Sequence, residues 1–259
     1  MDKLQNTVIL YFHGSPGGPD ELAALSLPKN LQIVPIDRLS FGVSYDDMLS
    51  NVRADILKRF PDKNLHLIGF SMGAMAVLQL GNVLGDKVMR IDLVSAATPL
   101  ELGHFLAKMA GRPVFDAAMR GGVRFSALCK FQAILLRFAP ALFFKMLFAS
   151  AAGEDRILAA DPTFKRQILK SYTTCLTDHP KAYADEIRAY VQPWAKELNG
   201  IDAPIHLWNG GADNWTPIEM AYALRDQLGP KTQLTEFARL SHYSTLAKAL
   251  PLILGKYND

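Results

Sequence analysis

The 259-residue sequence has little cysteine, no dense block of positive charge and no long uninterrupted apolar run. Its two cysteines, Cys129 and Cys175, have no CxxC partner and no histidine at zinc-ligand spacing. We therefore expect free thiols in a reducing, cytoplasmic setting, with a single disulfide left open as the alternative. The 28 basic and 25 acidic residues are spread along the chain and give a net charge of +3. This weak excess argues against nucleic acid as a partner.

Signals for membrane insertion are also scarce. The N-terminal stretch MDKLQNTVILYFHG lacks a basic region and a small-residue cleavage site, so we expect no signal peptide. The apolar stretch 131–152 is interrupted by Arg137, Pro140 and Lys145, whereas a membrane span needs about 20 apolar residues. We predict a buried or lid-like pair of helices there and no integral membrane segment. Peripheral contact with a lipid surface remains an alternative.

Short apolar runs alternate with helical patterns in the first hundred residues and again near the C-terminus. Runs that are apolar on both faces and separated by helices are typical of a parallel sheet covered on both sides. The sequence therefore predicts an α/β fold with a doubly wound, mainly parallel sheet of about six strands. The expected strands are 7–13, 31–37, 64–70, 87–97, 203–210 and 232–237. The expected helices are 45–60, 72–84, 217–228 and 243–257, the last interrupted by Pro251.

Residues 100–200 differ from these two halves, because they combine helical patterns and many large apolar side chains with few β-branched runs. We predict a helical insertion at 100–200 into a core domain formed by 1–99 and 201–259. The mixed charges of 153–167 indicate a solvated face. Arg38, after the second expected strand, either binds a carboxylate or closes its loop through local hydrogen bonds.

A serine between two glycines stands where an expected strand meets an expected helix, as Gly69-Phe70-Ser71-Met72-Gly73. A sharp strand-to-helix turn strains its central residue and exposes that side chain, and the following helix N-terminus directs N–H groups at the site. This context predicts that Ser71 is a nucleophile. A tight turn with an incidental serine is the alternative.

A serine nucleophile needs a base, and the base needs a carboxylate to orient it. Of the six histidines, His242 lies in the loop between the last expected strand and helix, at the same sheet edge as Ser71. Asp213 follows the strand 203–210 at that edge, whereas its rival Asp92 falls inside a strand. We therefore predict the catalytic set Ser71, Asp213 and His242, which also follows the chain order expected of such a triad.

Acyl transfer also needs N–H donors for the oxyanion that develops on the substrate. The amide of Met72, directly after Ser71, is the first candidate. The segment HGSPGG (13–18) supplies the second at Ser15, because Pro16 has no N–H. This segment does not end in Gly-Lys-Ser/Thr and does not read GxGxxG, so neither a phosphate-binding loop nor a dinucleotide site is indicated.

Five segments together resemble the α/β-hydrolase fold superfamily. They are HGSPGG, DRLSFGVS (37–44), GFSMGA, GGADNWTP and LSHYS. The resemblance implies a Ser–His–Asp hydrolase whose helical insertion is a cap over the site. Epoxide hydrolases and haloalkane dehalogenases of this fold have Asp where this chain has Ser71, so those activities are disfavoured. Only about five residues precede the first strand, so we expect six parallel strands without the family's N-terminal hairpin.

The predicted function is that of a carboxylesterase-like serine hydrolase. It would cleave a carboxylic ester or related acyl bond of a small, largely apolar substrate through an acyl-enzyme, with no metal or organic cofactor. The phenylalanines of the insertion favour an apolar pocket, although they also suit an ordinary helical core. Hydrolysis of a carbon–carbon bond by the same triad and a non-catalytic ligand-binding protein are the alternatives, and the oligomeric state is open.

Overall fold

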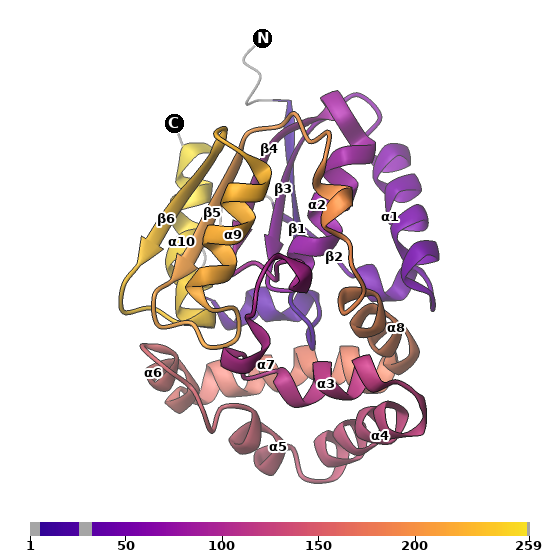
Figure 1. Cartoon of the computed structure of the whole chain (residues 1–259), viewed down its shortest axis with the longest axis vertical. Coiled ribbons are helices and arrows are strands. Elements are labelled where there is room, and N and C mark those ends of the chain that lie inside the picture. The colour runs from indigo at the N-terminus through magenta and orange to yellow at the C-terminus, as the bar shows by residue number, and fades with distance from the viewer. Residues whose placement is uncertain (1–5, 26–32, 258–259) are drawn as a thin grey trace.

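In the part of the chain that the structure describes, residues 6–25 and 33–257 of a computed structural model, six parallel strands form one sheet (Figure 1). The strand order is β2-β1-β3-β4-β5-β6, and all neighbouring pairs are parallel. This confirms the predicted sheet, although residues 31 and 32 of the expected second strand lie outside the described residues. The strands are β1 (Thr7–Phe12), β2 (Ile33–Ile36), β3 (Asn64–Phe70), β4 (Val88–Val94), β5 (Ile205–Gly210) and β6 (Thr232–Phe237).

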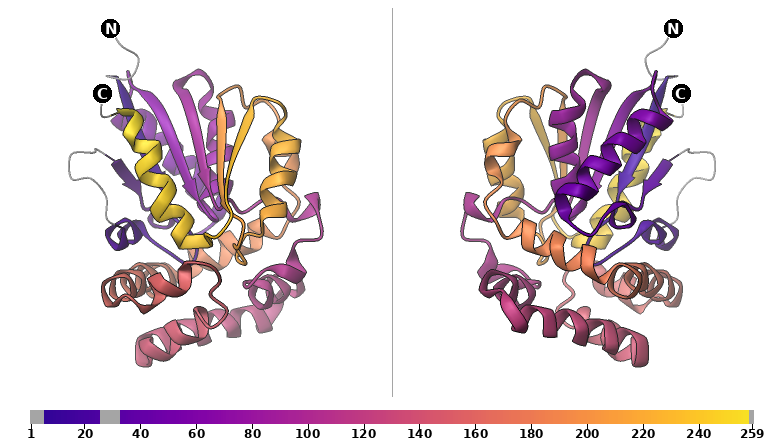
Figure 2. Two further views of the ribbon diagram at one scale, coloured as in Figure 1. Left: turned by 90° about the vertical axis from the view of Figure 1, so that its left-hand side faces the viewer. Right: turned by 90° about the vertical axis from the view of Figure 1, so that its right-hand side faces the viewer.

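Helices cover both faces of the sheet because its central strands are apolar on both sides. In β3, every side chain from Leu65 to Phe70 is buried. The helix α10 (His242–Leu254) lies on one face of the sheet, and α1 (Tyr45–Arg59) lies on the opposite face (Figure 2). The helices α2 (Gly73–Leu84) and α9 (Ile218–Leu228) lie on the same face as α1.

Residues 95–204, all of which the structure describes, form helices, turns and loops but no strand. Their main helices lie across the lower end of the sheet in Figure 1. We call α3 to α8 the cap; the exact division of the chain at 100 and 200 stays a prediction. The cap helices are α3 (Arg112–Arg120), α4 (Gly122–Phe138), α5 (Pro140–Leu147), α6 (Asp155–Ala160), α7 (Pro162–Thr173) and α8 (Pro180–Tyr190).

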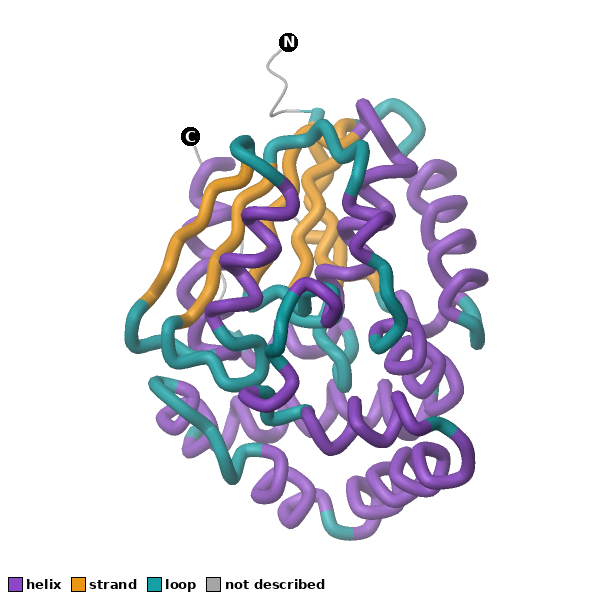
Figure 3. The backbone as a smooth tube through the Cα atoms, in the orientation of Figure 1, coloured by secondary structure: helices purple, strands orange, loops and turns teal. Residues whose placement is uncertain are grey.

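Loops gather between the sheet and the cap, as Figure 3 shows. Because all strands are parallel, the loops that leave their carboxyl ends meet at one edge. The residues after β1, β3, β5 and β6 therefore face the cap. Any site built from these loops has the sheet below it and cap helices above it.

The apolar stretch 131–152 forms the end of α4 followed by α5, as the predicted pair of helices requires. Phe143 and Phe144 are buried, whereas Phe131 and Phe138 are exposed. Among the described residues, none of the helices combines the length and the apolar character that crossing a membrane requires.

Pro251 does not interrupt the last helix, so that part of the prediction was wrong. The helix α10 runs from His242 to Leu254 with Pro251 inside it. A proline in a helix removes one hydrogen bond and crowds the preceding turn, at a cost of roughly 3 kcal/mol. Leu250, Ile253 and Leu254 are fully buried around it, and their packing offsets that cost.

Replacing Gly73 by alanine should destabilise the protein by about 1–3 kcal/mol, the usual cost of overpacking. A methyl group at Gly73 would lie 2.3 Å from the carbonyl oxygen of Phe12, so the backbone of β1 or α2 must move. Urea unfolding followed by circular dichroism measures the effect. Gly255→Ala is the matched control, because nothing lies within 4 Å of its added methyl group. Equal unfolding midpoints for the two variants would contradict the argument.

Candidate active site

Ser71 occupies the sharp turn between β3 and α2. Its φ is 52°, in the left-handed region that residues other than glycine rarely adopt. The Ser71 amide donates to the carbonyl oxygen of Val94 at 3.0 Å, and the Ala97 amide donates to the Ser71 carbonyl oxygen at 3.0 Å. The predicted strain at this serine is confirmed, and two backbone hydrogen bonds to the chain around the end of β4 hold it.

Asp213 and His242 are in direct contact. Asp213 follows β5, and His242 is the first residue of α10 rather than a loop residue before it. His242 Nδ1 lies 2.9 Å from Asp213 Oδ2, and both side chains are buried. An Nδ1–H that donates to the carboxylate leaves Nε2 as the free proton acceptor of the ring.

The carboxylate of Asp213 accepts further hydrogen bonds from Trp215 and Thr216, which are not among the predicted site residues. Its Oδ1 accepts from the amides of Trp215 at 2.8 Å and Thr216 at 3.0 Å, and its Oδ2 accepts from Thr216 Oγ1 at 2.9 Å. Burial alone would raise the pKa of Asp213, but His242 and these hydrogen bonds lower the pKa below its usual value. Asp213 is therefore a carboxylate at neutral pH.

Aromatic rings fix the orientation of His242. Trp215 stacks on it with ring centroids 5.6 Å apart and an interplanar angle of 21°. Phe70, directly before Ser71, contacts it with centroids 4.7 Å apart. The sequence NWTP after Asp213 indicates the contacts with Trp215 and Thr216. An Asx turn is expected there, and such a turn presents backbone amides to the aspartate.

Among the hydrogen bonds of the described residues, none joins Ser71 Oγ to His242. The structure thus brings Asp213 and His242 together and places Ser71 beside them, next to a residue that touches the His242 ring. Hydrogen bonds at catalytic serines are often long without substrate and shorten only when the substrate is bound. The grouping of the three residues as a triad stays a prediction.

A small cavity of about 150 Å³ reaches Ser71. Ser15 and Met72 also line it, as do apolar side chains of the cap. The backbone amides of Ser15 and Met72 donate none of the hydrogen bonds found within the described residues. Two residues that line the cavity beside Ser71 therefore have backbone N–H groups without a hydrogen-bond acceptor in the described part of the chain. The main apolar residues of this wall are Met109, which precedes α3, and Val114, Phe115, Met146, Leu147 and Ile187 of the cap.

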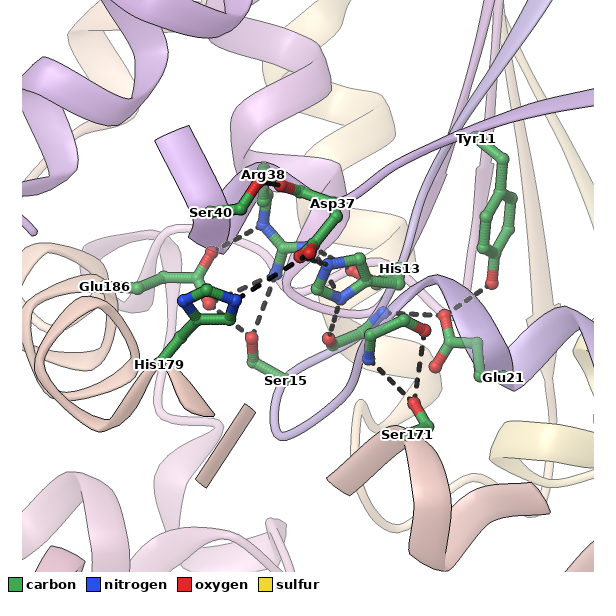
Figure 4. A network of polar contacts seen from close by, with 12 residues as sticks. Tyr11, His13, Ser15, Glu21, Asp37, Arg38, Ser40, Ser171, His179 and Glu186 are labelled. Atoms are coloured by element: carbon green, nitrogen blue, oxygen red, sulfur yellow. Dashed lines mark hydrogen bonds and ion pairs between the residues drawn. The ribbon is translucent and has the colours of Figure 1, made fainter. Parts of the chain in front are cut away.

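A buried ion pair joins Arg38 to the cap, and both of its residues bind the segment 13–18, which we call the Ser15 loop (Figure 4). Arg38 Nε donates to Glu186 Oε1 of α8 at 2.7 Å, and its Nη2 donates to Ser15 Oγ at 2.9 Å. The Ser15 hydroxyl also donates to Glu186 Oε2. Arg38 Nη1 completes the set by donating to the carbonyl oxygen of His13 at 2.6 Å. The carboxylate that Arg38 binds is that of the chain's own Glu186, which gave no signal in the sequence.

Glu21 supports the Ser15 loop from its other side. Its Oε1 accepts from Tyr11 Oη at 2.7 Å and from the Gly14 amide at 2.9 Å. Burial raises the pKa of Glu21 to about 7, although these hydrogen bonds favour the charged form. A cap residue also takes part, because the Gly18 amide donates to Ser171 Oγ at 2.7 Å.

Asp155 is an exception to the expected solvated face at 153–167, most of whose residues are exposed or partly exposed. Its carboxylate is buried and accepts from the amides of Tyr243 at 3.0 Å and Ser244 at 2.7 Å. These amides belong to the first turn of α10, where a negative charge is favourable. The cap thus binds the helix that begins with His242 through a side chain that the local charge pattern had assigned to solvent.

Asp92, the rival carboxylate, belongs to a separate cluster in the sheet. Its Oδ2 lies 2.7 Å from His66 Nε2, and its Oδ1 accepts from Trp208 Nε1 at 2.7 Å. Asp92 therefore connects neighbouring strands of the sheet and is not the carboxylate that contacts His242. Within residues 6–25 and 33–257, no group of three or more His, Cys, Asp or Glu side chains is arranged to hold a metal ion.

The raised pKa of Glu21 predicts that this residue makes the protein less stable as the pH rises. The carboxyl group has a pKa of about 7 in the folded protein against a usual 4.5, so its contribution is complete below pH 4.5 and is lost as the pH passes 7. The loss is on the order of 3 kcal/mol. Glu21→Gln should remove this slope, measured as the free energy of unfolding in urea at about pH 5 and about pH 8.

Glu154→Gln is the control for this measurement, because Glu154 is exposed and the variant should keep the parent's pH dependence. If Glu21→Gln keeps that dependence as well, Glu21 is not the group that titrates.

Glu186→Gln should destabilise the protein by about 3–5 kcal/mol, because it leaves the Arg38 guanidinium buried without a countercharge. Urea unfolding measures the loss. Arg38→Met combined with Glu186→Leu should cost less than the sum of the single changes. Asp116→Asn, which breaks the exposed pair with Arg112, should cost less than about 1 kcal/mol. A cost for Glu186→Gln as small as that of Asp116→Asn would show that the buried pair is not what stabilises this contact.

The sequence matches the Alpha/beta hydrolase family over residues 9–249. No curated protein matches it. Among solved structures, a bromoperoxidase from Bacillus anthracis has a TM-score of 0.67 and 19% identity, covering 98% of this chain and 91% of its own. MenH from S. aureus has a TM-score of 0.67 and 16% identity, covering 97% of this chain and 93% of its own.

An enol-lactonase from Burkholderia xenovorans LB400 is similar to the same extent, with a TM-score of 0.67 and 14% identity, covering 97% of this chain and 91% of its own. Identities this low show a shared fold and do not establish the activity of this chain. The family match, by contrast, spans nearly the whole chain and includes the segments that carry Ser71, Asp213 and His242. The chain therefore belongs to the Alpha/beta hydrolase family.

Proposed function

We propose that this protein is a serine hydrolase that cleaves a carboxylic ester or a related acyl bond of a small, largely apolar substrate. The observation that carries the proposal is the 2.9 Å contact between His242 and Asp213 at the sheet edge where Ser71 stands strained on the wall of a cavity. A serine, a histidine and a buried carboxylate that contacts the histidine are the parts that nucleophilic acyl transfer requires.

In the proposed reaction, the substrate's carbonyl group enters the cavity, and a side-chain rotation brings Ser71 Oγ to His242 Nε2. Ser71 Oγ attacks the carbonyl carbon as its proton passes to His242. The oxyanion that forms accepts hydrogen bonds from the backbone N–H groups of Ser15 and Met72, which line the cavity together with Ser71. Collapse of this intermediate releases the alcohol, which takes the proton from His242 and leaves the acyl group on Ser71.

Water then completes the cycle. It attacks the acyl group while His242 accepts one of its protons, and the second intermediate uses the same two amides. When this intermediate collapses, the carboxylic acid leaves and Ser71 regains its proton from His242. Asp213 stays ionised throughout; its role is to hold the ring tautomer and to stabilise the imidazolium that forms twice in the cycle.

The cavity supports a small apolar acyl or alcohol group. Apolar cap side chains form much of its wall, and a volume near 150 Å³ accommodates a group of about the size of benzene. We therefore propose a preference for acyl chains of up to about six carbons. The enol-lactonase among the similar structures is named for the hydrolysis of a cyclic ester, which agrees with this reaction class.

A series of p-nitrophenyl esters of increasing acyl length tests the proposal. The parent protein should turn over the short esters, and its kcat/KM should fall once the chain exceeds about six carbons. Ser71→Ala should abolish turnover and labelling by a fluorophosphonate. Asp213→Asn should lower kcat on the order of 10⁴-fold, because the His242 ring loses the partner that sets its tautomer.

Ser150→Ala is the matched control, since the exposed side chain of Ser150 lines the same cavity but takes no part in the proposed reaction. It should keep both turnover and labelling. Labelling of Ser71→Ala would overturn the assignment of the nucleophile. A folded parent protein that neither turns over these esters nor reacts with the probe would favour a ligand-binding protein instead.

A further inference from the structure

The helix α4 is apolar on two opposite sides. Phe125 and Leu136 are buried inside the cap, as an ordinary amphipathic helix requires. On the other side, Val123, Phe131, Ile134 and Phe138 are between 51% and 84% exposed. At about 100° per residue, these four side chains fall within about 80° of the helix circumference. They form a second apolar stripe that faces solvent.

The neighbouring helix α5 extends this stripe. Leu142 and Met146, one turn apart, are 49% and 54% exposed. In Figures 1 and 2, α4 and α5 form the layer of the cap farthest from the sheet. We call the six exposed apolar residues of the two helices the outer cap face. They are Val123, Phe131, Ile134, Phe138, Leu142 and Met146.

Positive charge surrounds the outer cap face. Between Asp116 and Glu154 the sequence has no acidic residue and five basic ones. On α4, Lys130 and Arg137 border the apolar stripe on one side and Arg124 borders it on the other. Within the described chain, none of the ion pairs involves these three cations or Lys145 of α5.

Two surface grooves beside α4 are lined by further cations. The groove between α4 and α8 has a volume of about 770 Å³ and a single acidic residue, Asp185. Its basic residues are Lys130, Arg137, Lys181 and Arg188. The groove between α4 and α7 has a volume of about 610 Å³ and no acidic lining residue. Its basic residues are Arg137, Lys165, Arg166 and Lys170.

The charge is a property of the cap and not of the whole chain. Residues 100–200 contain 14 basic and nine acidic residues, whereas the remainder contains 14 basic and 16 acidic ones. A basic surface with exposed phenylalanines on helices that lie side by side is the pattern of a structure that rests in the plane of a membrane surface. Apolar side chains enter the acyl region while cations contact anionic headgroups.

We propose that the outer cap face docks on the surface of a bilayer that contains anionic phospholipids, with α4 and α5 lying in the membrane plane. A second copy of the chain fits this face less well. A symmetric dimer would bring the cations of one outer cap face against the same cations of the other, with no acidic residue between 117 and 153 to pair with them.

The outer cap face is also continuous with the cavity at Ser71. Met146 is half-exposed on this face and at the same time lines the cavity, and Gln132 of α4 lines it as well. Docking therefore places Met146, which lines the cavity, in contact with the lipid, where small apolar esters accumulate. The docking itself does not depend on what Ser71 does, because it rests only on the surface of α4 and α5.

Flotation of the protein with lipid vesicles tests the docking. Binding to vesicles of phosphatidylcholine with about one-third phosphatidylglycerol should exceed binding to pure phosphatidylcholine by at least tenfold, and high salt should release it. Lys130→Gln combined with Arg137→Gln should weaken binding about 25-fold, at about fivefold for each cation. Phe131→Ser combined with Phe138→Ser should weaken it at least tenfold.

Two control variants lie elsewhere on the surface. Ile157→Ser removes an exposed apolar side chain of α6, and Arg53→Gln combined with Lys58→Gln removes two exposed cations of α1. Both should bind as the parent does. All variants change exposed side chains, and circular dichroism confirms that each is folded. Since no turnover is needed, Ser71→Ala should bind as tightly as the parent, which separates this test from that of the proposed function.

Four results would overturn the proposal. These are no binding to anionic vesicles, equal binding to neutral and anionic vesicles, equal losses in the control and outer cap face variants, and a dimer that Phe138→Ser dissociates. The last, measured by light scattering at the concentrations used for flotation, would assign the outer cap face to a second copy of the chain.

Discussion

The geometry at Ser71 depends on an abrupt change of backbone direction, because only Ser71 and Met72 separate the end of β3 from the start of α2. Ser71 adopts a φ of 52° there, and both its amide and its carbonyl group are bound by backbone from the end of β4. The helix can start this close to the sheet because Gly69 and Gly73 leave room for the backbone atoms of Ala74 and Phe12. All of these contacts involve the main chain, so the sheet itself sets the position of the serine.

Asp213 and His242 arrive at the same edge through the topology of the sheet. Each follows the carboxyl end of a parallel strand, and the neighbouring positions of β5 and β6 bring their loops together. Asp213 can remain charged inside the protein because two amides, a hydroxyl and an imidazole surround its two oxygens. The sheet thus supplies the polar residues, while the cap supplies the apolar side chains that enclose them.

Much of this was predictable from short-range pattern. The apolar run at 64–70 has the same bounds in the structure as in the sequence, because every residue after Asn64 is buried between two layers of helices. Ser71, Asp213 and His242 could be assigned to one edge because each follows an expected strand. Pro251 misled the prediction, since local propensity does not register how firmly α10 packs against the sheet.

The buried carboxylates of the cap were beyond such reasoning. Glu186 lies on an amphipathic helix and meets Arg38, which is 148 residues away in the sequence. Asp155 stands in a segment of mixed charge and meets Tyr243, 88 residues away. A charged residue on a helix is ordinarily solvated, and only the docking of the cap on the sheet turns these two into buried acceptors. The exposure of the apolar stripe on α4 could not be predicted either, because a phenylalanine at helical spacing ordinarily packs inward.

Glu186 and Asp155 also limit how this insertion can be exchanged in evolution or in protein engineering. A chimera that receives another helical insertion leaves Arg38 without its anion and the first turn of α10 without its acceptor. Such a chimera must carry carboxylates at equivalent places or change position 38 at the same time. The insertion and the sheet are therefore coupled by buried charge, even though the chain passes between them only twice.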